Sequence, residues 1–118
     1  TPSGYAETLT SSGSALSAEN LTISVPNDFA LLQNFPNPFN PTTSITYHLQ
    51  TSSPTSVTIY DLMGNRVKDL FSGLENPGYK SINWDATDNN GDLVSSGIYF
   101  YKLQVGESFD IKRMMYLK

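Results

Sequence analysis

The sequence predicts an all-β fold in which short antiparallel strands form two packed sheets. Apolar and polar residues alternate in several short segments, which is the period of a half-buried strand. Gly, Pro, Asn and Asp residues separate these segments, and these residues favour tight turns. No stretch of about 11 or more residues repeats apolar side chains at the helical period. The chain of 118 residues is long enough for one such domain.

The predicted strands follow one another from the middle of the chain to its end. In the strand at 44–49, one face is apolar: Ile45, Tyr47 and Leu49. The strand at 98–105 has the strongest pattern, and its apolar face consists of Tyr99, Tyr101, Leu103 and Val105. The other expected strands are residues 57–60, 67–71, 79–84 and 109–117.

The last predicted strand has a less regular pattern than the others. We expect Phe109 and Ile111 to point inward, toward the core. Asp110 and Lys112 would then point outward. The doublet Met114-Met115 breaks the strict alternation and indicates a β-bulge.

The number of strands indicates the type of sandwich. About seven short strands in the roughly 90 residues of 29–118 are typical of an immunoglobulin-like antiparallel β-sandwich. Trp84 is the only tryptophan, and we expect it to fill the core between the two sheets. A tight turn at 62–66 can place Gly64 or Asn65 at a positive φ.

A proline-rich segment at residues 35–43, called the proline ramp here, precedes the strands. Pro36, Pro38 and Pro41 lack the backbone donor that helices and central strands need. Each proline also favours an extended conformation in the residue before it. We therefore expect a stiff entrance to the domain, with Phe35 and Phe39 as anchors.

Charge and composition narrow the class of partners. The formal net charge of −4 argues against nucleic acid as the main partner. The basic residues gather late, since none precedes Arg66 and four of the seven lie between Lys102 and Lys118. The absence of cysteine excludes disulfides and thiolate metal sites. No apolar run reaches the roughly 18 residues of a transmembrane helix.

Residues 1–28 differ from the rest of the chain because they are rich in Ser and Thr and poor in aromatic residues. This composition predicts a flexible linker or the end of an upstream region. The alternation at 21–25 fits a short strand as well as the end of an upstream domain. The chain begins at Thr1 without an initiator Met, so we expect a processed product or a piece of a longer protein.

Residues suited to catalysis are sparse. His48 is the single histidine and lies on the polar face of a predicted strand, so it offers no catalytic triad and no His-based zinc site. The sequence contains no G-x-S-x-G, G-x-G-x-x-G or P-loop motif. The acidic residues lie mainly in turns, away from the cleft that paired catalytic carboxylates need. We therefore expect that the domain is not an enzyme.

The acidic loop at residues 85–92 has two interpretations. Ca²⁺ takes oxygen ligands, and four residues could supply them: Asp85, Asp88, Asn90 and Asp92. The glutamate that closes an EF-hand loop at its twelfth position is absent. The alternative is an Asx-rich turn in which side chains cap backbone donors and Gly91 supplies a positive φ.

The order of the segments resembles a known family. Any one motif is weak, but several in register are specific. The motifs are Phe-Pro-Asn-Pro-Phe-Asn-Pro at 35–41, Val-Thr-Ile-Tyr-Asp-Leu-Met-Gly at 57–64, Gly78-Tyr79, Trp84-Asp85, Asn90-Gly91, Ser-Gly-Ile-Tyr-Phe-Tyr-Lys-Leu at 96–103 and the basic end at 112–118. Over about residues 29–118 they are similar to the type A C-terminal sorting domain of type IX secretion cargo. They also resemble the immunoglobulin-like domain of the flagellar hook-capping protein.

The resemblance implies a non-catalytic sorting signal for an attached upstream cargo. Such domains end secreted enzymes and adhesins of Gram-negative bacteria, which cross the periplasm and then the outer membrane to be anchored at the cell surface or released. The implied partners are the outer-membrane translocon and a sortase-like peptidase, and no cofactor is implied. The recognition residues that the resemblance implies are Pro36, Asn37, Pro38, Gly97, Ile98, Tyr99, Lys112, Arg113 and Lys118.

Physical reasoning supports part of this role and leaves alternatives. A terminal strand at a sheet edge offers free backbone groups, so a receptor can read it by strand addition. Its basic residues would steer an acidic partner; the alternative is that they only guard the edge against aggregation. Two other functions remain open: a structural or assembly module of a surface or flagellar-type filament, and a carbohydrate-binding module. The stacking platform of the latter would use Tyr60, Tyr79, Trp84 or Tyr101.

Overall fold

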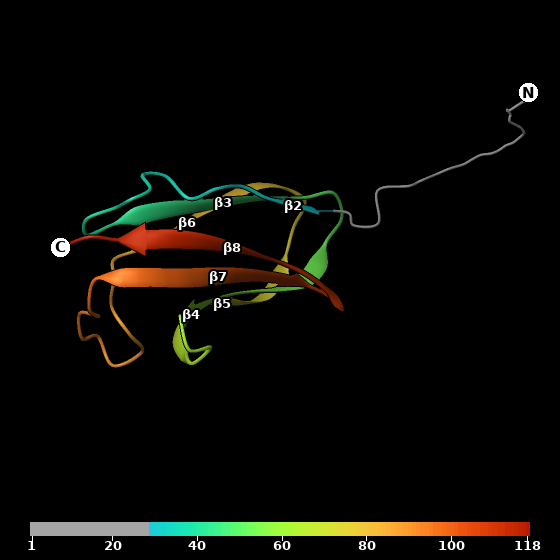
Figure 1. Cartoon of the computed structure of the whole chain (residues 1–118). Coiled ribbons are helices and arrows are strands. Elements are labelled where there is room, and N and C mark those ends of the chain that lie inside the picture. Colours follow the sequence, from blue (N-terminus) through green and yellow to red (C-terminus); the bar gives the residue numbers. More distant parts are fainter. Residues whose placement is uncertain (1–28) are drawn as a thin grey trace, which may run out of the picture.

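The computed structural model describes residues 29–118, which form two antiparallel β-sheets packed face to face (Figure 1). The strands are β2 (Phe29–Leu31), β3 (Thr43–Leu49), β4 (Ser53–Asp61), β5 (Arg66–Glu75), β6 (Gly78–Trp84), β7 (Gly97–Val105) and β8 (Ser108–Tyr116). This arrangement confirms the predicted all-β sandwich. No helix in residues 29–118 is long and apolar enough to cross a membrane. The linker and short strand considered for residues 1–28 lie outside the described residues.

The chain passes back and forth between the two sheets. One sheet has the order β2-β3-β6, and the other has the order β5-β4-β7-β8. Every neighbouring pair within a sheet is antiparallel. β8 is therefore an edge strand of the four-stranded sheet, and its end lies beside the proline ramp (Figure 1).

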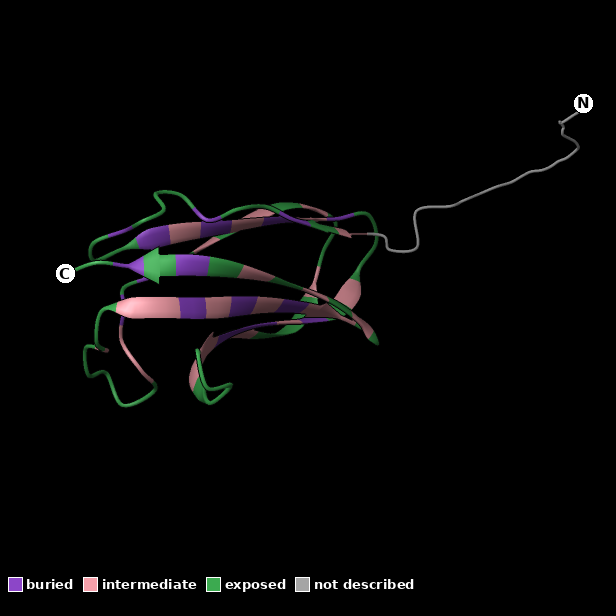
Figure 2. Cartoon of the chain, viewed as in Figure 1, coloured by how far each residue is buried: buried purple, intermediate pink, exposed green. Residues whose placement is uncertain are grey.

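The core lies between the sheets, where side chains from the inner faces meet. Figure 2 shows buried positions alternating with less buried ones along β3 and β7. Trp84 is 1% exposed, which confirms its expected place in the core. The core cluster consists of Leu31, Phe39, Ile45, Tyr47, Leu49, Val57, Ile59, Trp84, Ala86, Tyr99, Tyr101, Leu103, Met114 and Tyr116.

Strand β2 is absent from the predicted strands, because three residues are too few to show a period of two. Its place comes from its pairing with β3, in which Phe29 lies opposite Leu49 and Leu31 opposite Tyr47. Leu31 is buried in the core. The pairing thus joins the start of the described chain to the three-stranded sheet.

The side-chain orientation predicted for β8 is wrong. Phe109 and Ile111 are 54% and 46% exposed, whereas Met114 and Tyr116 are 1% and 2% exposed. The pairing with β7 explains the difference, because residues directly opposite on neighbouring strands share a face. Met114 lies opposite the inward-facing Tyr99, so Met114 points inward as well.

The same register corrects two further predictions for β8. Asp110 and Lys112 lie opposite Leu103 and Tyr101, so they occupy inner-face positions and not outer ones. Both are half-buried at the edge of the sheet. The pairing of β7 with β8 runs without a shift, so the Met114-Met115 doublet forms no bulge. The register shifts occur instead between β4 and β5.

Candidate functional site

The proline ramp carries the chain from one sheet to the other. At its start, Phe35 and Ser44 of β3 exchange backbone hydrogen bonds of 3.0 and 2.8 Å. Four residues later, the Phe39 N–H donates to Met115 O of β8 at 3.0 Å, and the Leu117 N–H donates to Phe39 O at 3.1 Å. The peptide bonds before the three ramp prolines are cis. The ramp therefore lies as a short parallel partner along the end of β8.

The two ramp phenylalanines differ. Phe39 is 2% exposed, and its ring lies 5.2 Å from the ring of Tyr116 and 5.7 Å from that of Trp84. Phe39 is thus the expected anchor. Phe35 is 79% exposed, so the prediction that it anchors the ramp is wrong. The backbone of Phe35 pairs with β3, which leaves its side chain on the solvent side.

A buried hydrogen-bond network fixes the start of the ramp. Asn34 Nδ2 donates to Thr43 Oγ1 at 2.9 Å, and the Thr43 hydroxyl donates to Pro36 O at 2.9 Å. The Tyr101 hydroxyl donates to Leu32 O and accepts from the Asn34 N–H, both at 2.8 Å. Burial raises the pKa of Tyr101 to about 12. This network holds the ramp to β7 as well as to β3.

Asn37 connects the ramp to the last strand by its side chain. Asn37 Oδ1 accepts from the Met115 N–H at 3.0 Å. Upstream of the ramp, Gln33 Nε2 donates to Arg113 O at 2.8 Å. Together with the backbone bonds of Phe39, these contacts occupy the outward backbone groups from Arg113 O to Leu117 N. The expectation that the basic end offers a free edge for strand addition is therefore wrong for this half of β8.

The start of β7 lies against the end of β8. Gly97, Ile98 and Tyr99 pair with Tyr116, Met115 and Met114. Tyr99 is buried, its hydroxyl donates to Ser95 O at 2.6 Å, and its ring lies 5.4 Å from that of Trp84. Tyr99 is thus a core residue, whereas Ile98 lies on the outer face of the sheet.

Three sequence motifs meet at this end of the sandwich, which we call the convergent end: residues 36–38, 97–99 and 113–118. A cavity of about 290 Å³ lies among them, with Asn37, Pro38, Ile98, Arg113 and Met115 in its lining. Arg113 and Lys118 are exposed, and the backbone N–H of Lys118 donates to Ser96 Oγ at 2.9 Å. Of the recognition residues that the sequence implied, Tyr99 and Lys112 are turned toward the inner face of the sheet.

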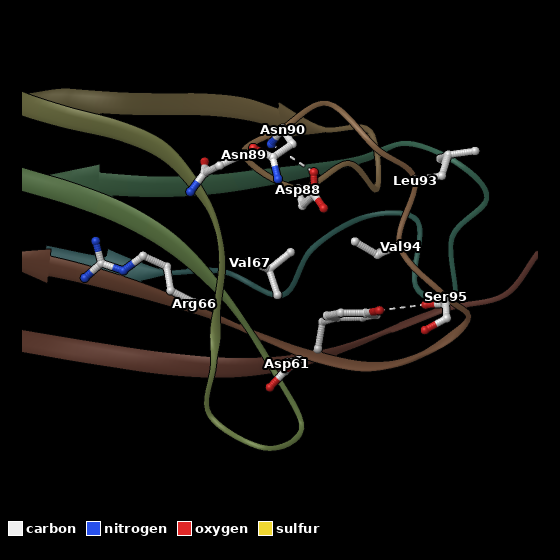
Figure 3. Close-up of a pocket in the computed structure, with 10 residues that line it drawn as sticks. Asp61, Arg66, Val67, Asp88, Asn89, Asn90, Leu93, Val94 and Ser95 are labelled. Carbon is white, nitrogen blue, oxygen red and sulfur yellow. Dashed lines mark hydrogen bonds between the residues drawn. The ribbon is translucent and has the colours of Figure 1, made fainter.

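The acidic loop forms the Asx-rich turn that the sequence offered as one of two interpretations. Asp88 Oδ1 accepts from the backbone N–H groups of Asn90 and Asp92 at 2.9 and 3.0 Å, and Gly91 has φ 87°. Figure 3 shows Asp88 turned toward Asn90 at the rim of a polar cavity of about 430 Å³. Within residues 29–118, no three acidic or histidine side chains gather as a metal site.

Asp85 is also engaged within this loop. The Thr87 hydroxyl donates to Asp85 Oδ1, and this hydrogen bond lowers the pKa of the carboxyl. The indole N–H of Trp84 donates to Thr87 O at 2.8 Å, which joins the loop to the core. The carboxylate oxygens of Asp85 and Asp88 thus stabilise the turn itself.

Two of the four residues considered for sugar stacking are inaccessible. Trp84 and Tyr101 are buried, so their rings cannot form a platform. Tyr79 is exposed and packs on His48, with the ring centroids 4.5 Å apart. Tyr60 is half-buried.

Sequence reasoning missed the contacts that seat the ramp. Gln33 and Asn34 belong to no motif of the sequence, and the motif at 96–103 does not reveal that the Tyr101 hydroxyl bonds to Asn34, because these partners are distant along the chain. Asn37 did carry a signal, since an Asn between two prolines has a side chain free to replace missing backbone hydrogen bonds.

Comparison with known families decides where the chain belongs. The model of the FlgD Ig-like domain family matches residues 37–108, which is more than half of the 118 residues. The chain belongs to this family. No curated protein matches the chain.

Two solved structures from Porphyromonas gingivalis share the fold. Dimeric latent PorU is 21% identical, with a TM-score of 0.64 over 80% of this chain and 10% of that one. PorZ, an essential bacterial surface component of the type-IX secretion system, is 22% identical, with a TM-score of 0.52 over 73% of this chain and 11% of that one. At these identities the likeness shows the fold alone. The resemblance drawn from the sequence is thus confirmed for the family and the fold, and this chain spans about a tenth of each protein.

Proposed function

We propose that this FlgD Ig-like domain is a non-catalytic sorting signal. It would direct an attached upstream protein through the outer membrane by type IX secretion, for anchoring at the cell surface or release. The observation that carries this proposal is the convergent end, where motifs up to 78 residues apart in sequence form one surface with exposed cationic groups.

The similarity in fold to PorU and PorZ gives the proposal independent support. The domain resembles about a tenth of PorU and of PorZ, which is the size relation expected of a module within a longer chain. PorZ is described as a surface component of the type-IX secretion system. A related role for this chain implies passage through the periplasm and a final place outside the cell or on its surface.

Recognition at the convergent end would rely on side chains and shape. The ramp already pairs with the backbone of β8 there, so a translocon or sortase-like peptidase cannot add a strand without displacing it. Arg113 and Lys118 instead offer two exposed cations, and the cavity beside Asn37 and Ile98 offers a shaped surface. An acidic partner surface would be steered toward these groups.

The chemistry of the described residues supports a non-catalytic role. His48, the only histidine, packs on Tyr79 at the surface. The carboxylates of the acidic loop, Asp85 and Asp88, accept hydrogen bonds that shape their own turn.

A secretion assay tests the proposal. A reporter protein with an export signal to the periplasm is fused before Thr1 and expressed in a bacterium with a type IX system. We expect digestion of the reporter by protease added to intact cells, or its release into the medium, only when residues 1–118 are attached. A reporter that stays in the periplasm with the folded domain attached would disprove the proposal. Deleting β8 is a poor control, because Met114 and Tyr116 belong to the core.

Membership of this family is also compatible with the assembly function. The oligomeric state of the domain in solution distinguishes that function from sorting. An assembly module should form stable oligomers at micromolar concentration by sedimentation velocity. A sorting signal carried on one cargo chain should sediment as a monomer. An oligomeric domain that fails the secretion assay would favour the assembly function.

A further inference from the structure

The outer faces of the two sheets differ in chemistry. On the three-stranded sheet the cross-strand pairs carry mainly polar groups: Ser44 with Asn83, Thr46 with Ser81 and His48 with Tyr79. On the four-stranded sheet, apolar and basic side chains share one surface. We call it the basic-apolar face, and it consists of Tyr60, Phe100, Lys102, Phe109, Ile111 and Arg113.

The residues of the basic-apolar face are neighbours across three strands. Tyr60, Phe100 and Arg113 form one row across β4, β7 and β8, and Lys102 lies opposite Ile111 in the next row. Lys102 Nζ lies 4.9 Å from the centre of the Phe109 ring. A mainly apolar hollow of about 470 Å³ adjoins Phe100 and Ile111. The exposed apolar area is therefore contiguous and not a scatter of single side chains.

The charge of this face is opposite to that of the chain. The formal net charge is −4, yet the face carries Lys102 and Arg113. The single ion pair within residues 29–118 joins Arg66 to Asp69, so neither cation of the face has a carboxylate partner there. Cations beside exposed apolar groups favour a ligand that brings both acidic and apolar side chains.

The backbone beside this face is open in the first half of β8. Both the N–H and the C=O of Met115 bond to the ramp, so alternate residues of β8 direct their backbone groups away from β7. Phe109, Ile111 and Arg113 share this orientation. Gln33 covers Arg113 O, and Asp110 Oδ1 accepts from the Ile111 N–H. Between Ser108 and Lys112, no other backbone strand within residues 29–118 pairs with this edge.

We propose that this open edge and the basic-apolar face bind an extended acidic and apolar peptide segment of a partner protein. The segment adds as a strand beside Phe109 and Ile111, where its backbone replaces the local Asp110 contact. Its apolar side chains cover Phe109 and Ile111, and an acidic side chain lies beside Arg113. A lipid tail could cover the apolar groups but has no donors or acceptors for the backbone, and the hydroxyls of a glycan do not repeat at the spacing of a β-strand. The site shares Arg113 with the cavity of the convergent end but does not require the sorting function.

A designed peptide tests the proposal on the full 118-residue chain. The probe is acetyl-Glu-Thr-Val-Thr-Val-amide, whose Glu falls opposite Arg113 and whose Val residues fall opposite Ile111 and Phe109 in an antiparallel addition. In ¹H–¹⁵N spectra of the labelled protein, we expect saturable shifts at the amides of residues 109–113. A peptide with Lys in place of Glu should bind about fivefold more weakly. A peptide with Pro in place of the central Val should not bind, because it lacks the central backbone donor.

Variants of the protein show how much the backbone N–H of Ile111 and the charge of Arg113 each contribute to peptide binding. Ile111→Pro removes an outward N–H that β7 does not use, so we expect loss of binding in a folded domain. Ile111→Thr keeps that N–H and should weaken binding only a few-fold. Arg113→Glu should remove the preference for the Glu peptide, and Arg113→Gln should reduce it.

Three results would overturn the proposal. The first is no saturable shift at residues 109–113 with the Glu peptide. The second is equal binding of the Glu, Lys and Pro peptides. The third is a set of shifts at the same amides that depends on protein concentration without peptide, which would show that a second copy of the chain occupies the edge. Failure of the secretion assay would leave the peptide result unchanged, so the two proposals are tested separately.

Discussion

The two halves of β8 belong to one strand but have different surroundings. In the second half, Met114 and Tyr116 fill the core, and the ramp bonds to the outward backbone groups. In the first half, Phe109 and Ile111 face solvent, and no strand of the described chain pairs with the edge. The difference arises because the backbone pairs with β3 through Phe35 and reaches β8 only at Phe39. Because the chain changes from one sheet to the other at the ramp, it covers the edge of β8 in the second half and leaves the first half unpaired within the described residues.

The largest expected difference between the halves concerns stability. Met114→Ala and Tyr116→Ala should lower the free energy of unfolding by about 2–5 kcal/mol each, because they remove fully buried side chains. Ile111→Ala should cost under about 1 kcal/mol, since nearly half of that side chain is exposed. Urea unfolding followed by the fluorescence of Trp84 measures all three. Equal losses for Ile111 and Met114 would contradict the orientation of β8.

The next effect concerns the buried hydroxyl that holds the start of the ramp to β7. Tyr101→Phe leaves the buried Asn34 N–H without its acceptor, so we expect a loss of about 1–3 kcal/mol near pH 7. The raised pKa of Tyr101, about 12 against an ordinary 10.0, adds a dependence on pH. The neutral form is favoured by folding, so this contribution is complete below pH 10 and is lost as the pH rises through about 12.

Urea midpoints between pH 8 and pH 12 check this behaviour. The urea midpoint of the wild type should exceed that of Tyr101→Phe below pH 10, and this difference should shrink as the pH rises above 10. The comparison with the variant is needed because burial and Glu75 also raise the pKa of Tyr47, which is present in both proteins. A constant difference across the whole range would contradict the burial of the Tyr101 hydroxyl.

A smaller effect tests how the ramp covers the edge. Asn37→Ala removes the side-chain acceptor of the Met115 N–H, and we expect a cost of about 1 kcal/mol. Asn40→Ala is the matched control, because Asn40 is also exposed and also precedes a proline but is not the acceptor of the Met115 N–H. Amide hydrogen exchange should speed up at Met115 in the first variant only. Unchanged exchange at Met115 would show that Asn37 does not protect this edge.

Much of the fold could be predicted from the sequence because it depends on local alternation. The inward faces of β3 and β7 follow from Ile45 to Leu49 and from Tyr99 to Leu103, and the structure confirms them. β8 was harder, because Phe109 and Ile111 are more hydrophobic than Asp110 and Lys112. The pairing with β7 sets their orientation regardless, and that pairing is a long-range property.

The candidate site was predictable in its members but not in its geometry. The ramp, the start of β7 and the basic end each carried a motif, and the structure brings most of these residues together. How these residues cover the edge of β8 depends on hydrogen bonds between residues distant in sequence, such as Gln33 with Arg113. The basic-apolar face likewise depends on which strands are neighbours in the sheet.

The central claim is that the convergent end directs sorting, and a matched pair of charge reversals tests it most directly. The first reporter fusion carries Arg113→Glu with Lys118→Glu, and the second carries Arg66→Glu with Lys80→Glu, which changes the net charge equally. Circular dichroism and Trp84 fluorescence confirm that both domains fold. The account predicts that the first fusion stays in the periplasm while the second reaches the cell surface. Equal delivery of the two fusions would contradict it.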